Sequence, residues 1–299
     1  MIIIQVAGGL GNQLQQYALY QKFLSLGVEA RLDLSWFYTE TQQSISVPRE
    51  LELGYFDQLE YQPCTTAEKK NLYGGSDLLG KVRRRFLPYT VRLFQESEMY
   101  HPEIFDVTNR YIIGYFACEK YYHDILPKLR EQIRFKPSKN PRNVQMAEEM
   151  RNCDSIAVHI RRGDYLSSGN RELYGGICTK DYYERAIDYI SQRHPQAQFY
   201  FFSDDPDYVR SEYTKKDATI IDWNYGDDNI YDMYLMSVCK HIICANSTFS
   251  FWGARLNKNE GKIMIRPLRH RNNLIADPER MKSLWPGWTL IDREGKMYG

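Results

Sequence analysis

The residues of this chain that are best suited to chemistry follow a short apolar run at 155–158, which predicts a buried strand. They form the segment His159-Ile160-Arg161-Arg162-Gly163-Asp164-Tyr165, which carries an imidazole, two guanidiniums and a carboxylate. In α/β proteins the end of a buried strand is where ligands bind. Adjacent arginines suit a phosphate-bearing ligand, because their planar donors match phosphate oxygens and stay charged at any working pH.

Alternation along an extended segment places His159 and Arg161 on one face, while Arg162 points the other way and is open to a structural role. The competing interpretation is a surface salt-bridge cluster at the end of a strand. The type of charge and its topological position both favour ligand binding.

A second apolar run, at 198–203, delivers Asp204 and Asp205 to the end of its strand. Their carboxylates can accept hydrogen bonds from a base or a ribose, and Asp205-Pro206-Asp207 has a spacing that can hold a divalent metal. The alternative is a helix cap, because Asp before Pro commonly starts a helix. Metal binding is disfavoured, since no histidine or third carboxylate lies nearby in the sequence.

A third strand, at 241–245, runs into Asn246 and then into hydroxyl residues that precede a helix. Hydroxyls and free N–H groups at a helix N-terminus form an anion site, although plain capping is commoner. The residues concerned are Ser247, Thr248, Phe249 and Ser250. Together with the arginine segment, they predict a diphosphate ligand, hence a nucleotide sugar or a dinucleotide.

The N-terminus opens with a strand at 2–7, a glycine-rich turn at 8–13, a helix at 14–26 and a strand at 28–34. Gly9-x-Gly11-x-x-Leu14 matches part of a dinucleotide fingerprint but lacks the third glycine; Asp33 lies at a plausible ribose distance. The alternative is a tight turn whose glycines permit positive φ. The turn also brings Asn12 close to a ligand.

The whole chain has 299 residues and a net charge of +1. That length predicts two domains, 1–140 and 141–299, divided by a linker at 136–141, and the last helix can cross back. Strands alternate with helices throughout the second half, as in a doubly wound α/β domain. The net charge gives no reason to expect nucleic acid binding, and nothing in the sequence indicates an oligomeric state.

Six scattered cysteines without a Cys-x-x-Cys pair favour a reduced, cytoplasmic protein. The N-terminus lacks the features of a signal peptide, and no segment is apolar enough to cross a bilayer. A basic run, Lys81-Val82-Arg83-Arg84-Arg85, is by default a solvated face. It can also contact anionic lipid or an acidic partner, which would place the protein on the cytoplasmic face of a membrane.

Four ordered motifs resemble those of the bacterial α-1,2-fucosyltransferases, glycosyltransferase family 11. They are Gly8-Gly9-Leu10-Gly11-Asn12-Gln13, His159-x-Arg161-Arg162-Gly163-Asp164-Tyr165, Phe202-Ser203-Asp204-Asp205-Pro206 and Asn246-Ser247-Thr248-Phe249-Ser250-x-Trp252. One mild departure is Gln15, where many relatives have Phe. The middle of the N-terminal half carries no matching motif, so the acceptor is the least constrained inference.

The resemblance implies an α/β, GT-B-like fold with two Rossmann-type domains facing a central cleft. The N-terminal domain would hold the acceptor, and the C-terminal domain would bind the donor, GDP-β-L-fucose. Neither a metal nor any other cofactor is expected. The reaction implied is inverting transfer of fucose to the 2-hydroxyl of a galactose-terminated glycan.

By the same resemblance, Arg161 holds the β-phosphate, and His159 with Asp204 or Asp205 contacts ribose and guanine. Ser247, Thr248, Phe249 and Ser250 bind phosphate, and Asn12 lies near fucose beside Gly9 and Gly11. Inversion calls for a base, and a carboxylate is the usual one. Asp164 is the first candidate, unless it only orients an arginine; Glu172 is a weaker one, and a strongly dissociative transition state needs none.

Two other classes of function remain open at this point. One is an NAD-dependent sugar-nucleotide oxidoreductase or epimerase, which the missing third glycine disfavours. The other is a non-catalytic glycan-binding protein, which only an activity assay separates from an enzyme.

Overall fold

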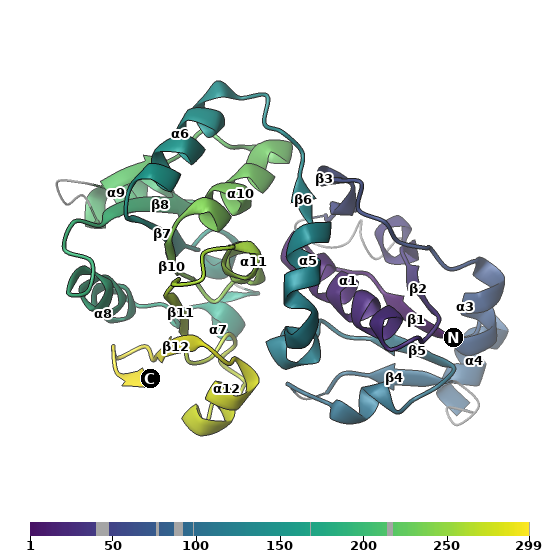
Figure 1. Ribbon diagram of the computed structural model, residues 1–299. Helices are drawn as coiled ribbons and strands as arrows, with labels where there is room; N and C mark the ends of the chain where they lie inside the picture. The colour runs from purple at the N-terminus through teal and green to yellow at the C-terminus, as the bar shows by residue number, and fades with distance from the viewer. Residues whose placement is uncertain are drawn as a thin grey trace. The chain divides into compact units, whose positions relative to one another are not determined.

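The computed structural model describes residues 1–39, 48–75, 78–86, 92–97, 99–167, 169–213 and 218–298. The chain divides into two compact units, Met1–Arg134 and Phe135–Gly299. The division falls inside the short strand β6 (Arg134–Phe135), just before the predicted linker. The final helix α12 (Pro278–Leu284) and the strands after it belong to the second unit (Figure 1).

The first unit is built on a parallel sheet with strand order β2-β1-β5-β4. These strands are β1 (Ile2–Gln5), β2 (Ala30–Asp33), β4 (Leu93–Gln95) and β5 (Arg110–Ile113). The helices are α1 (Leu10–Ser25), α3 (Thr66–Leu72), α4 (Leu78–Phe86) and α5 (Leu126–Gln132). Shorter elements are η1 (Ser35–Tyr38), η2 (Leu53–Tyr55), β3 (Phe56–Asp57), η4 (Pro102–Phe105), η5 (Glu119–Tyr121) and η6 (His123–Ile125).

The second unit has a seven-stranded sheet with order β13-β12-β11-β10-β7-β8-β9. Its strands are β7 (Ser155–Ile160), β8 (Gln198–Ser203), β9 (Ala218–Ile221), β10 (His241–Ile243), β11 (Met264–Pro267), β12 (Trp288–Ile291) and β13 (Met297–Tyr298). All neighbours pair in parallel except β13, which closes one edge antiparallel to β12. Its other elements are α6 (Pro141–Asn152), η7 (Asp164–Leu166), α7 (Arg171–Tyr174), α8 (Lys180–Ser191), α9 (Pro206–Glu212), η8 (Gly226–Asn229), α10 (Ile230–Val238) and α11 (Thr248–Leu256).

Side chains of β7 alternate between two helical layers. Ile156, Val158 and Ile160 pack in one core cluster with Tyr182 of α8 and its neighbours, whereas His159 lies on the opposite face beside Phe249 of α11. Figure 1 shows α8 on one side of this sheet and α10 and α11 on the other. This two-sided covering is what a parallel sheet requires, and it confirms the predicted α/β class.

One predicted boundary in the first unit is wrong. Helix α1 begins at Leu10 rather than Leu14, so Gly11 and Asn12 are helical and the turn before them is shorter. Farther along, residues 119–132 form η5, η6 and α5 in succession rather than one continuous helix. Pro127 explains the break, because proline lacks the N–H that a helix interior needs and favours a first turn.

No helix among the described residues is long and apolar enough to cross a membrane. The longest of the described helices, α1, has sixteen residues and carries several polar side chains.

Candidate functional site

The carboxyl end of β7 presents Arg161 beside a carboxylate from the neighbouring strand. An Nη1 of Arg161 lies 3.2 Å from Oδ2 of Asp204, and both side chains are about a quarter exposed. The other oxygen of Asp204 accepts the backbone N–H of Arg162 at 2.9 Å. Asp204 therefore fixes both the backbone after β7 and the guanidinium that the sequence singled out.

Arg162 turns away from that pair, as its position in the alternation predicted. Its Nε donates to Oδ2 of Asp205 at 3.0 Å, and its guanidinium lies 3.5 Å from the ring centre of Tyr208. The other oxygen of Asp205 accepts the N–H of Tyr208 and caps α9. Of the two aspartates, Asp205 is thus occupied by capping, and Asp204 is the one beside Arg161.

His159 is buried and its Nδ1 has no hydrogen-bond partner. Burial, helped by the charge of Arg161, lowers the pKa of this histidine to about 3. The imidazole is therefore neutral at physiological pH, with one buried polar atom that lacks a partner. A buried polar atom left unsatisfied in this way is uncommon and calls for a functional reason.

Helix α11 starts immediately after β10 and points its N-terminus toward the same edge of the sheet. Ser247 is its N-cap, accepting the N–H of Phe249 at 3.4 Å. Thr248 and Phe249 are partly exposed, whereas Ser250 is fully buried and donates its hydroxyl to the Ser247 carbonyl. The first turn can therefore meet an anion through its N–H groups and the hydroxyl of Thr248, while the hydroxyl of Ser250 closes the turn from within.

Asn246 joins the loops that follow three different strands. Its Nδ2 donates to the carbonyls of Tyr174, at 3.0 Å, and His270, at 3.3 Å. The backbone carbonyl of Asn246 accepts a hydrogen bond from the hydroxyl of Tyr165, and the ring of Tyr165 stacks on Tyr174. This buried amide thus sets the positions of the loops after β7 and β11 around the start of α11.

Sequence reasoning missed a basic side chain within β11, Arg266. Val158, Ile243 and Ile265 are in register, so Arg266 lies level with His159, on the face that carries α11. Arg266 is fully buried, 4.6 Å from the ring centre of Phe251. The sequence pattern could have predicted this basic site. An apolar run is followed by basic residues, as it is before Arg161; here they are Arg266, Arg269, His270 and Arg271.

The local field at this edge is positive. Burial lowers the pKa of His270 well below its usual range, and the charges of Arg266 and Arg271 lower it further. The positive charge of Arg161 likewise adds to burial in lowering the pKa of His159. Two histidines kept neutral chiefly by burial, and further by neighbouring guanidiniums, indicate a surface suited to an anion.

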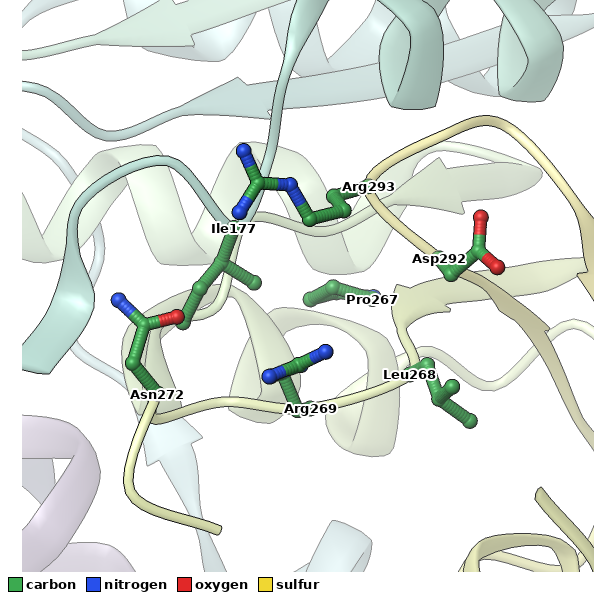
Figure 2. A pocket seen from close by; sticks show the side chains of 7 residues that line it. All are labelled: Ile177, Pro267, Leu268, Arg269, Asn272, Asp292 and Arg293. Atoms are coloured by element: carbon green, nitrogen blue, oxygen red, sulfur yellow. The ribbon is translucent and has the colours of Figure 1, made fainter. Parts of the chain in front are cut away.

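A small cavity of about 10 Å³, room for about one water molecule, lies farther along, between the loops after β11 and β12. Figure 2 shows Arg269 and Arg293 approaching it from opposite sides, with Ile177 and Asn272 at one end. Neither Arg161 nor His159 lines it. Ligand pockets usually hold about 300–1,000 Å³, so this pocket is small for a nucleotide sugar.

The glycine-rich turn of the first unit is a separate group. Gly8 has φ +81°, and a Cβ there would lie 2.7 Å from Nδ2 of Asn12. Gly9, the N-cap of α1, has an ordinary φ of −77°, and Gly11 is helical. The positive φ expected of these glycines is therefore confined to Gly8. Asn12 is partly exposed in the first turn of the helix.

Two glutamines that sequence reasoning left unassigned hold this turn. Gln16 accepts the N–H of Ala7 and donates to the carbonyl of Gly114, each at 2.9 Å. Gln13 donates to the carbonyl of Gly8 and accepts the N–H of Glu52. These amides explain why the helix begins early: side chains one turn into α1 hold the turn and the loops beside it.

The two candidate bases have different standing. Asp164 begins η7, and its side chain lies outside the described part of the chain. Glu172 is exposed in α7, where its backbone carbonyl accepts Nδ2 of Asn272. The carboxylate of Glu172 is thus on a surface turn tied to the loop after β11.

Among the described residues, one group has the composition of a metal site: Asp154, His194 and His241. It lies at the amino ends of β7 and β10, the edge of the sheet opposite Arg161. Nδ1 of His241 accepts the N–H of Ile263 at 3.0 Å, so in the neutral ring the proton is on Nε2, facing Asp154. A protonated Nε2 cannot bind a metal. The three side chains instead contact one another, with Asp154 between the two histidines.

The comparisons with known proteins agree with this chemistry. An Escherichia coli α-1,2-colitosyltransferase is 31% identical over 89% of this chain and 91% of its own. A Caenorhabditis elegans galactoside 2-α-L-fucosyltransferase is 29% identical over 54% of this chain and 46% of its own. Among solved structures, apo POFUT1 covers 89% of this chain and 97% of its own, with 13% identity and a TM-score of 0.42.

The family model for glycosyl transferase family 11 matches residues 95–292, which include the arginine segment, both aspartates and the start of α11. That span is more than half of the chain, and it excludes the NAD-dependent alternative. The chain therefore belongs to glycosyltransferase family 11 and is a glycosyltransferase.

Proposed function

We propose that this enzyme transfers L-fucose from GDP-β-L-fucose to the 2-hydroxyl of a terminal galactose, with inversion and without a bound metal. The observation that carries the proposal is the positive edge of the second unit. Arg161, the neutral His159 and the N-terminus of α11 gather there at the ends of adjacent strands. The names of the two relatives support the α-1,2 linkage, and one supports a galactoside acceptor.

In this proposal the diphosphate meets Arg161 and the first turn of α11. As the glycosidic bond breaks, negative charge develops on the departing GDP, and a preorganised guanidinium stabilises it. Arg161 is preorganised because Asp204 holds it. The unpartnered Nδ1 of His159 and the free lone pairs of Asp204 serve ribose or base.

The first unit supplies the acceptor side, with Asn12 and the backbone at Gly9 and Gly11 turned toward the sugar. Inversion requires the galactose hydroxyl to attack from the face opposite GDP. Asp164 is the proposed base, two residues after Arg162 in the sequence. If Asp164 only orients an arginine, then Asp164→Asn retains substantial activity and Glu172→Gln becomes the next variant to measure.

A second donor is favoured by one specific observation, the 31% identity to a colitosyltransferase. Colitose lacks one hydroxyl of fucose, so a site built to hydrogen-bond that hydroxyl would discriminate strongly between the two sugars.

The deciding experiment incubates the enzyme with GDP-fucose or GDP-colitose and a panel of β- and α-galactosides, with linkage analysis of each product. We expect α-1,2-fucosylated galactosides and undiminished rates in EDTA. Colitose transfer in preference to fucose would replace the donor. A product linked elsewhere than O2 would overturn the acceptor assignment, and donor hydrolysis alone would leave the acceptor class unsupported.

A further inference from the structure

Helix α4, remote in sequence from the proposed donor site, exposes an unusual amount of apolar surface. Leu78, Leu79, Val82 and Phe86 are 77, 79, 43 and 67% exposed. Single exposed apolar side chains are ordinary. Four within one nine-residue helix form a patch of the kind that marks an interaction surface.

The four side chains share one face of the helix. At about 100° per residue, Leu78, Val82, Phe86 and Leu79 span an arc of about 100°. Arg83 borders this arc on one side, and Lys81 and Arg85 border it on the other. The helix contains no acidic residue, so its outer surface is an apolar strip between two basic margins.

The back of α4 is fixed to the first unit. Gly80 is buried, and a Cβ there would lie 2.0 Å from the carbonyl oxygen of Gly75. Arg84 donates to the same carbonyl at 2.8 Å, and its guanidinium lies 4.6 Å from the ring centre of Tyr73. Because Gly80 and Arg84 hold the inner face, the apolar strip is left facing outward. Figure 1 shows α4 beside α3 in the first unit.

We propose that α4 is a docking surface for a membrane rich in anionic phospholipid. An apolar strip with basic margins is the pattern of helices that lie in the lipid interface. The apolar side chains would enter the acyl boundary, while Lys81, Arg83 and Arg85 would meet the phosphates. A helix of nine residues lies on such a surface and cannot span it.

The chemistry favours lipid over the other occupants of such a surface. Nucleic acid or an acidic protein would use the basic margins but leave four large apolar side chains in water. A second copy of this chain would cover the apolar strip but bring the same cations together. Only an anionic lipid surface satisfies both features of α4 at once. One short helix gives weak, reversible and salt-sensitive attachment.

The test is vesicle flotation of the full-length protein. Vesicles of phosphatidylcholine alone are compared with vesicles containing about 30% phosphatidylglycerol, at about 50 mM and about 500 mM NaCl. We expect the protein to float with the anionic vesicles at low salt and to be largely released at high salt. The absence of binding to anionic vesicles at low salt would overturn the proposal.

Two double variants assign the binding to α4. Leu79→Ser with Phe86→Ser removes apolar surface, and Lys81→Gln with Arg85→Gln removes charge. Each is expected to lower the bound fraction about fivefold or more. Matched controls lie outside α4: Tyr225→Ser with Ile275→Ser, both exposed apolar residues, and the exposed pair Lys128→Gln with Lys139→Gln for charge. Of these four controls only Lys128 belongs to the first unit, on α5.

All eight substituted positions are on the surface and leave the core intact, so melting temperatures should match the unaltered protein. Transfer rates with a water-soluble galactoside should also be unchanged, because α4 carries none of the proposed site. Equal binding by both α4 variants and their controls would assign the attraction to another surface. A light-scattering mass that shows a dimer, lost only in Leu79→Ser with Phe86→Ser, would assign the strip to a second copy instead.

Discussion

Two arginine–aspartate pairs lie next to each other where β7 and β8 end. They have the same composition but different contacts and surroundings. Arg162 and Asp205 are used within the fold: one stacks on Tyr208 and the other caps α9. Arg161 and Asp204 make a longer contact, 3.2 Å, on the face shared with the neutral His159. Adjacent residues of one type therefore occupy different environments, because successive side chains of an extended segment point to opposite sides.

Replacing Arg161 tests the comparison most severely. Arg161→Ala is expected to lower kcat/KM by at least about 100-fold, the usual cost of removing one donor that stabilises developing charge. Initial rates with GDP-fucose and a galactoside measure the effect. The control is Arg193→Ala, an arginine that stacks on Tyr189 of α8 and should leave the rate unchanged. Near-normal activity of Arg161→Ala would remove the arginine from the mechanism.

The pH dependence of stability should report His159. Its pKa is about 3 in the folded protein, against about 6.5 when unfolded. As pH falls below 6.5, the unfolded state takes up the proton first, so stability present at neutral pH is lost progressively toward pH 3. At pH 5 the loss is about 2 kcal/mol.

Urea denaturation at several pH values measures this effect. His159→Asn should lose less stability between pH 7 and pH 5 than the unaltered protein does, with the slope due to His270 remaining. Arg162→Ala should keep the full slope, since Arg161 rather than Arg162 acts on His159. Parallel curves for all three proteins would mean that His159 accepts a proton without penalty.

Gly163 offers a milder way to disturb the Arg161 pair. A Cβ at this position would lie 2.4 Å from Oδ2 of Asp204, so Gly163→Ala must displace the carboxylate that holds Arg161. We expect kcat/KM to fall about tenfold, through loss of preorganisation, with little change in melting temperature. Gly169→Ala, where the added methyl group meets open space, is the control. An unchanged rate would show that Asp204 does not position Arg161.

The smallest change in rate is expected from Arg162→Ala. This variant loses a half-exposed ion pair and a cation–π contact, which together stabilise the fold by about 1 kcal/mol. The urea midpoint should fall, while kcat/KM stays within about threefold of normal. A loss of activity as large as that of Arg161→Ala would erase the distinction between the two pairs.

The sequence predicted the second unit better than the first. Strands β7 and β8 lie where the apolar runs at 155–158 and 198–203 predicted them, because each run is followed by charged residues. Strand β4 was missed: it is three residues long, and Leu93 and Gln95 are exposed, so no periodicity marks it. The early start of α1 depends on Gln13 and Gln16, whose partners lie far along the chain.

Within the candidate site, the types of residue were predictable but their partners were not. Which arginine meets which aspartate depends on the register between β7 and β8, where Ile160 pairs with Ser203. Arg266 follows an apolar run in the sequence, yet nothing in its own segment shows that β11 lies beside β10 rather than at an edge. Sheet order is a property of the whole chain.

Replacing Asn246 would lower the specificity of this enzyme, even though Asn246 is not among the groups proposed to contact its ligands. The carboxamide of Asn246 donates to carbonyls in two segments, and its backbone carbonyl accepts the hydroxyl of Tyr165, so the segments after β7 and β11 share a single anchor. An aspartate of the same shape would offer no N–H groups and would leave two carbonyls unsatisfied. If these loops shift together, the selectivity of the enzyme for its donor would decrease.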